Sequence, residues 1–256
     1  RVDITGDSID DNIDILMIVH PQGLSEQLRY AIDQHVLRGG KAIVFLDPNA
    51  ETLVMRSPQG ALIPAGMSSD LPDLLNAWGV QYDPSKVLAD NELAMRVTMG
   101  ASGRPVPHLG MIGVQRANMA ESDIITNRLE TVYLASSGAI SQAAGASTRF
   151  EPLMQSSVDS MLMESALLEN VMDPSILFDE FAATDESYVV AARISGMIES
   201  AFPDGRPAVV VDENPTDDVE TGALEAAEVI EEEAETPHIA SSNAEVNLLV
   251  FADTDL

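Results

Sequence analysis

Residues 13–48 carry the clearest pattern of apolar and polar positions in the chain. Ile13–Val19 is an apolar run broken only by Asp14, which is typical of a strand covered on both faces. Apolar residues then recur at every fourth position, which places them on one side of a helix. They are Leu24, Leu28, Ile32 and Val36. A Gly-Gly pair ends this helix, and a second apolar run, Ala42–Leu46, comes next. The pattern predicts two parallel strands joined by a right-handed helical crossover.

The rest of the chain reads mainly as strands separated by turns. Residues 49–68 show no sustained period and predict a long loop, and residues 71–78 predict a short helix. Within 81–120, short apolar runs separated by Asp, Asn, Gly and Pro predict a β-rich annex inside a single α/β domain that spans residues 1–256. A helix is predicted near 122–129, and further strands are predicted at 130–134, 149–155, 187–198 and 244–251.

An acidic segment differs from this pattern. Residues 212–236 contain eleven acidic residues and no basic one, and like charges at helical spacings of three and four repel each other. We therefore expect a loosely held acidic insertion over residues 212–238. An acidic arm that binds a partner is the alternative.

Charge and composition narrow the classes of partner. The 256 residues include 42 acidic and 13 basic side chains, and the net charge of −29 repels nucleic acid and anionic lipid. We expect no nucleic-acid partner. Cysteine is absent, which excludes disulfides, thiolate nucleophiles and Cys-ligated metals. No apolar run approaches the ~20 residues of a membrane-spanning helix, yet the chain starts without Met, and we interpret it as a piece of a longer protein.

Polar side chains gather where the predicted strands end, and ligands of open parallel sheets bind outside the carboxyl ends of the strands. The candidates for ligand binding are His20, Gln22, Asp47, Asn49, Ser136, Asp253 and Asp255. His20 and Asp47 would form half of a general-base pair if their strands are neighbours. The chain lacks the G-x-S-x-G frame of a serine nucleophile. We therefore assign no catalytic residue, and a hydrolase is the weaker alternative.

Metal and cofactor sites find little support in the sequence. The chain contains neither an H-E-x-x-H motif nor a four-ligand cluster of suitable spacing. Asp47, Asp253 and Asp255 as an oxygen site for Ca²⁺ or Mg²⁺ are the alternative, but short acidic phrases are frequent in so acidic a chain. We expect no metal and no cofactor.

Methionine is abundant, with twelve residues, whereas one Trp, four Tyr and six Phe are few for a dedicated sugar-binding surface. The Met-rich run 160–172 could line a helix with Met161, Leu162, Leu168 and Val171. Ordinary core packing is the first explanation of this run. If its apolar face is exposed, it is our first candidate for a partner surface.

Three stretches together resemble a known family. They are IDILMIVHPQGLSEQLRYAIDQHVLRGGKAIVFLDP at 13–48, YVVAARISGMIESAFPDG at 188–205 and LLVFADTDL at 248–256. With them the chain resembles auxiliary components of ABC-type transport systems related to the gliding-motility component GldG, whose core looks like one found in intraflagellar-transport proteins. The resemblance implies an α/β, Rossmann-like (class I amidotransferase-like) fold with a mostly parallel sheet and helices on both faces.

The resemblance also implies partners and a location. The expected partners are the ABC permease and ATPase subunits of the same system, and the expected location is a periplasmic, extracytoplasmic domain of an inner-membrane protein whose membrane helices lie outside this stretch. The expected function is that of a non-catalytic accessory domain that acts by protein–protein contact. The alternative is a ligand-binding domain, for a polysaccharide or a small ligand, with its pocket at the strand ends.

Overall fold

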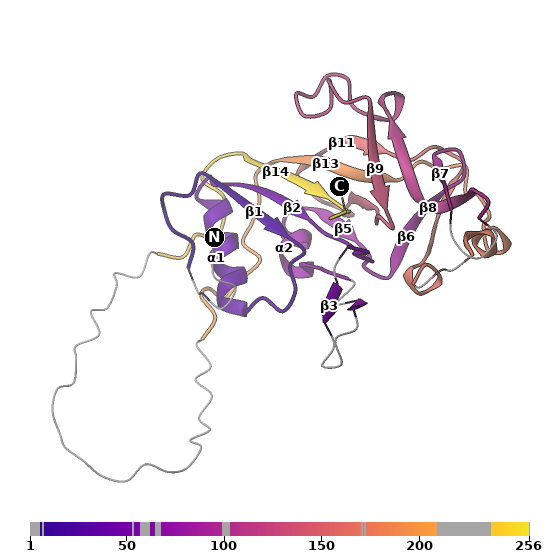
Figure 1. The fold of residues 1–256 in the computed structure, drawn as a ribbon. Coiled ribbons are helices and arrows are strands. Elements are labelled where there is room, and N and C mark those ends of the chain that lie inside the picture. Colours follow the sequence, from indigo (N-terminus) through magenta and orange to yellow (C-terminus); the bar gives the residue numbers. More distant parts are fainter. Residues whose placement is uncertain are drawn as a thin grey trace, which may run out of the picture.

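The computed structural model describes residues 6, 8–52, 54–56, 62–64, 68–98, 103–169, 171, 173–208 and 237–255. A twisted main sheet runs through the middle of the molecule, with both α-helices on the same side of it (Figure 1). Most of the predicted acidic insertion, residues 212–236, lies outside the described residues. The assignment of one domain with an annex at 81–120 stays a prediction.

The strand–helix–strand unit predicted from residues 13–48 is confirmed. It consists of β1 (Ile15–Val19), α1 (Glu26–Leu37) and β2 (Lys41–Phe45), and β1 pairs with β2 in parallel. The hydroxyl of Ser25 accepts a hydrogen bond from the backbone N–H of Leu28 at 3.0 Å and caps the start of α1. The short helix predicted at 71–78 is α2 (Pro72–Ala77).

The main sheet has seven strands and mixes both directions of pairing. Its order is β1-β2-β14-β13-β10-β5, with β11 also paired to β13. Among the described strands of this sheet, β1 pairs with β2 and β2 with β14 in parallel. The antiparallel pairs are β14 with β13, β13 with β10, β13 with β11, and β10 with β5. The additional strands are β5 (Val80–Tyr82), β10 (Ile140–Gln142), β11 (Arg149–Gln155), β13 (Val189–Gly196) and β14 (Val246–Phe251).

Smaller antiparallel sheets surround the main sheet. They are formed by β3 (Val54–Arg56) with β4 (Leu62–Pro64), by β6 (Lys86–Asp90) with β12 (Ser160–Glu164), and by β8 (Val106–Gln115) between β7 (Ala94–Val97) and β9 (Thr131–Ala135). Short 3-10 helices lie at Arg116–Asn118, Ser165–Leu167 and Pro174–Asp179.

The predicted fold class is wrong. The described residues form a β-rich structure of mixed and antiparallel sheets, not a Rossmann-like, mostly parallel sheet with helices on both faces. Helices α1 and α2 pack on one face only, in a core that includes Leu16, Val44 and Val250. The second face is covered by strands instead of helices, with Ile112 and Leu134 packed near Leu249.

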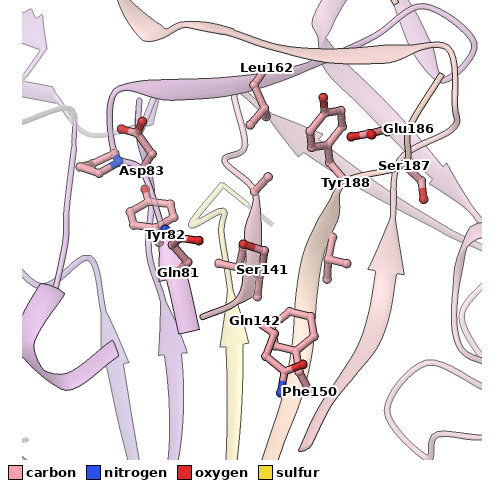
Figure 2. A pocket seen from close by; sticks show the side chains of 14 residues that line it. Gln81, Tyr82, Asp83, Ser141, Gln142, Phe150, Leu162, Glu186, Ser187 and Tyr188 are labelled. Carbon is pink, nitrogen blue, oxygen red and sulfur yellow. The ribbon is translucent and has the colours of Figure 1, made fainter. Parts of the chain in front are cut away.

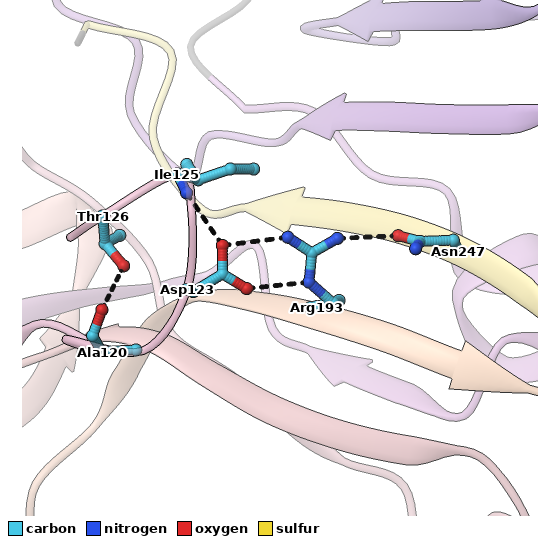
Figure 3. Close-up of polar contacts among 6 residues, drawn as sticks. All are labelled: Ala120, Asp123, Ile125, Thr126, Arg193 and Asn247. Atoms are coloured by element: carbon cyan, nitrogen blue, oxygen red, sulfur yellow. Dashed lines mark hydrogen bonds and ion pairs between the residues drawn. The ribbon is translucent and has the colours of Figure 1, made fainter. Parts of the chain in front are cut away.

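The region predicted as a helix near 122–129 is a series of turns. Asp123 in this region accepts two hydrogen bonds from the guanidinium of Arg193 in β13, at 2.9 Å from Nε and 3.0 Å from Nη2 (Figure 3). Nη1 of Arg193 donates to Oδ1 of Asn247 in β14 at 2.8 Å. Arg193 thus ties the turns to β13 through the two-pronged pair and to β14 through Asn247.

Candidate functional site

Asp47 follows β2 and lies at the carboxyl end of the parallel strands. Its side chain is fully buried. Oδ1 accepts from the backbone N–H of Asn49 at 2.8 Å, and Oδ2 accepts from the backbone N–H and the hydroxyl of Thr254, at 2.8 and 2.5 Å. The backbone N–H of Asp47 donates to the hydroxyl of Ser69 at 3.0 Å. The carboxylate therefore fastens the segment after β14 to the end of β2.

The other predicted acids continue this network. Oδ2 of Asp253 accepts from the backbone N–H of Ala135 at 3.0 Å, and its Oδ1 accepts from the backbone N–H of Asp255 at 2.6 Å. Asp255 in turn accepts from the backbone N–H of Glu51 at 2.8 Å, and the hydroxyl of Ser136 donates to the carboxylate of Glu51. The structure thus brings together four of the predicted residues, Asp47, Ser136, Asp253 and Asp255.

Burial dominates the electrostatics of this cluster. Desolvation raises the pKa of Asp253 to about 8, and the negative charge of Asp47 adds to the shift. Desolvation also raises the pKa of Asp47 to about 6, against the hydrogen bonds from Thr254 and Asn49, which lower it. The pKa of Glu51 is raised for the same reason. Asp253 is therefore the member of the cluster that is most prone to hold a proton near neutral pH.

The remaining candidates lie around this cluster. His20 is half-buried with a positive φ of 49°, and its backbone N–H donates to the carbonyl of Phe45 at 2.9 Å. The side-chain amide of Gln22 donates to the carbonyl of Ser68 at 2.7 Å. Asn49 is buried beside Asp47, and its Oδ1 has no hydrogen-bond partner among the residues that the structure describes.

The strand-end region is filled by the protein itself. Asp47, Asn49, Ser136 and Asp253 are each at most 1% exposed, and the carboxylates of Asp47 and Asp253 bind backbone N–H groups. No group of His, Asp and Glu that suits a metal ion occurs in the described part of the chain. Sequence reasoning missed Glu51 because it lies in the loop after β2, outside any motif. The geometry is that of a structural clasp between strand ends.

A second feature lies at the edge of the same sheet. The burial of β1 alternates, and its outward residues Ile15, Met17 and Val19 are 55%, 62% and 55% exposed. We call these three residues the β1 face. In the parallel register Met17 lies beside Ile43 and Val19 beside Phe45, which are half-buried, and the ring of Phe45 stacks on Phe251 at 4.8 Å. The strand cover of this side of the sheet therefore stops at β2.

The Met-rich run is core rather than surface. Met161 and Leu162 belong to β12 and are half-buried, whereas Leu168 and Val171 are 4% and 8% exposed and pack in a small core with Leu109 and Leu177. The helix that this run could line is absent, because the described part of the run forms a strand and a 3-10 turn. Asn170 and Met172 lie outside the described residues.

The comparisons with known proteins bear on the class of system to which these features belong. A family model described as "ABC-type uncharacterized transport system" matches residues 1–256. No match was found among curated proteins or among solved structures. Among the described helices, none has the length and apolar character needed to cross a bilayer. Because the family model covers the whole sequence, the chain belongs to this ABC-type transport family and has an accessory role in a transport system.

Proposed function

We propose that the chain is a non-catalytic accessory domain that binds the permease subunit of its ABC-type transport system through the β1 face. In this proposal the domain contacts the permease directly and the ATPase of the system only indirectly, through the permease. Family membership supports the class of partner, and three large apolar side chains exposed on one strand support the place. The proposal includes an extracytoplasmic location in an inner-membrane parent and kinship with the gliding-motility component GldG.

The β1 face has two properties of a contact surface. Exposed apolar side chains that adjoin a continuing apolar sheet face favour association, because burial removes them from water. In addition, β1 is the first strand of the sheet order, so one side of its backbone is not paired within the described sheet. A segment of the permease that adds a strand there would satisfy the backbone and cover Ile15, Met17 and Val19 together.

Charge argues for this partner and against a second copy of the chain. A second copy would carry the same net charge of −29, and like charges oppose association. Asp10 and Asp14, both exposed, precede β1. The expected partner segment is therefore apolar at its centre and basic at the end that lies beside the start of β1, which complements the edge in both respects.

The alternatives at the strand ends receive less support. A ligand pocket around His20, Asp47 and Asp253 would need accessible polar groups, yet the two carboxylates are buried and bonded to backbone amides. A hydrolase built on a serine, His20 and Asp47 would need the serine hydroxyl aimed at the imidazole of His20. The hydroxyl of Ser136 donates to the carboxylate of Glu51 instead.

Co-purification of the chain, in its membrane-attached parent, with the permease and ATPase of its own system tests this proposal. Met17→Lys places a charge at the centre of the β1 face and should reduce recovery of the permease at least about tenfold. Val158→Lys is the matched control, because Val158 is 56% exposed and lies in the loop between β11 and β12. Equal recovery with both variants, with both folded by circular dichroism, would contradict the proposal.

A further inference from the structure

A cavity of about 640 Å³ opens beside β5, β10 and the start of β13, away from the β1 face. Figure 2 shows Tyr82 and Tyr188 on opposite sides of it, with Ser141 between them and Phe150 below. The three rings come from β5, from β11 and from the residue before β13. They are half-buried, whereas the polar groups around them are exposed. The cavity therefore has aromatic walls and a polar rim, and its volume lies in the range of small-molecule sites.

The aromatic walls are held in place by the fold. The hydroxyl of Tyr188 is hydrogen-bonded to that of Thr184 at 2.9 Å, and its backbone N–H donates to the hydroxyl of Ser156 at 2.8 Å. Tyr82 backs on Gly138 so closely that a Cβ there would lie 2.8 Å from Cε2 of the ring. None of the ring pairs that stack in the described residues joins two walls of the cavity. The walls are thus preorganised and do not pack on one another.

The rim carries negative charge only. Asp83 and Glu186 line the cavity, and none of its fourteen lining residues, all of them described, is Lys, Arg or His. Ser85 donates its backbone N–H and its hydroxyl to Oδ1 of Asp83, which lowers the pKa of Asp83 and keeps it ionised at neutral pH. Lys86, the basic residue that follows, is paired with Glu164. A cavity lined by one sign of charge concentrates ligands of the opposite sign.

We infer that this cavity binds a small organic cation of the quaternary or alkylated ammonium class. Aromatic faces attract such cations through the ring quadrupole, and the attraction is stronger where the cation leaves water. The carboxylates of Asp83 and Glu186 supply the counter-charge at the rim. An anionic ligand would meet only repulsion there, and a neutral ligand would use the rings without the charge.

Choline and its neutral isostere 3,3-dimethyl-1-butanol separate these cases, because they share shape and hydroxyl group and differ in the charge of one atom. Calorimetric titration at low ionic strength should give saturable binding of choline to one site, with 3,3-dimethyl-1-butanol at least about tenfold weaker. Tyr188→Leu should weaken choline about tenfold as well, since it removes one wall. A neutral disaccharide, maltose, serves as the third probe.

A further control separates the effect of the two rim carboxylates from the attraction that the net negative charge of the whole protein exerts on any cation. Asp83→Asn combined with Glu186→Gln should weaken choline about tenfold. Glu92→Gln combined with Glu169→Gln removes the same charge at two exposed positions outside the cavity lining and should leave the affinity within about twofold. Equal losses in the two double variants, equal binding of choline and its isostere, absence of saturable choline binding, or tighter binding of maltose would each overturn the inference.

Discussion

Asp47 and Thr254 lie 207 positions apart in the sequence and are joined by two hydrogen bonds, from the backbone N–H and the hydroxyl of Thr254 to Oδ2 of Asp47, at 2.8 and 2.5 Å. The pair fastens the end of β2 to the segment after β14. Oδ1 of Asp47 is engaged within the chain as well, because it accepts from the backbone N–H of Asn49. We therefore expect Asp47 to contribute to the stability of the fold, and ligand binding at the strand ends stays a prediction.

Replacing Asp47 should destabilise the fold. Asp47→Ala leaves the backbone amides of Asn49 and Thr254 without their acceptor, and we expect a loss of about 2 kcal/mol in the free energy of unfolding. Urea denaturation followed by circular dichroism measures this loss. Asp204→Ala is the control, because Asp204 is exposed, and it should change stability by less than about 0.5 kcal/mol. A loss no larger than the control would mean that the clasp is unimportant.

The buried Asp253 should make the protein less stable as the pH rises. Its pKa is raised to about 8 in the folded chain, mainly by desolvation, and in the unfolded chain it returns to its ordinary value of about 3.9. Between these values the folded chain binds one more proton than the unfolded chain, so stability falls as pH rises and the loss is complete above about pH 9.

Asp253→Asn removes this titration. Between about pH 7 and about pH 9, the melting temperature of the wild type should fall more than that of Asp253→Asn. The burial of His35 and His108 lowers their pKa values, so their titration lies below this window. Parallel curves for wild type and variant would show that Asp253 ionises as an ordinary surface carboxylate does.

Gly138 should tolerate no side chain. A Cβ at this position would lie 2.8 Å from Cε2 of Tyr82 and 3.4 Å from Cδ of Pro48, so Gly138→Ala forces the tyrosine ring to move. We expect a destabilisation of about 1–3 kcal/mol by thermal or urea unfolding. Gly113→Ala is the matched control, since its nearest neighbour atoms would lie at 3.5 Å, an ordinary contact distance. Equal stability of the two variants would refute the tight contact.

Lysine should not replace Arg193 without a loss of stability, because Arg193 binds Asp123 through two nitrogen atoms. Side-chain exposure of the two residues is only 19% and 16%, and both prongs of the guanidinium are used. Arg193→Lys keeps the charge but loses the fork, and we expect about 1–2 kcal/mol less stability. Arg116→Lys should cost less than about 0.5 kcal/mol, because its partner Glu130 is 80% exposed. Similar urea midpoints for the two variants would contradict this account.

The sequence predicted the strand–helix–strand unit correctly, but it did not predict what covers the faces of the sheet. The four-residue period of α1 and the two flanking apolar runs predicted a parallel unit, and the structure has it. However, an apolar run looks the same whether one face or both are covered, so Ile13–Val19 gave no sign that Met17 is 62% exposed. That ambiguity produced the wrong expectation of a first strand covered on both faces. The expectation of helices on both faces of the sheet came from the family resemblance.

Side-chain competition explains the helix that did not form. Oδ1 of Asp123 accepts from the backbone N–H of Ile125 at 2.9 Å, and the hydroxyl of Thr126 donates to the carbonyl of Ala120 at 2.6 Å. Such local bonds satisfy the backbone in turns rather than in a helix. The prediction of a helix near 122–129 did not take these side-chain bonds into account.

Only part of each candidate site could be predicted, because the sequence indicates local elements but not which distant segments meet. The neighbouring ends of β1 and β2 follow from their parallel pairing, but the partner of Asp47 is Thr254, which only the tertiary fold brings there. The cavity is assembled from β5, β10, β11 and the start of β13, and its residues form no motif in the sequence.

Site-specific photocrosslinking tests the central claim, that the β1 face is covered by the permease. A photoreactive phenylalanine analogue replaces Met17 in one full-length variant and Val158 in another, and the crosslinked partners are identified in membranes that contain the whole system. The account predicts crosslinks to the permease from position 17 and none from position 158. Permease crosslinks from position 158 alone, or crosslinks from position 17 only to a second copy of the chain, would contradict it.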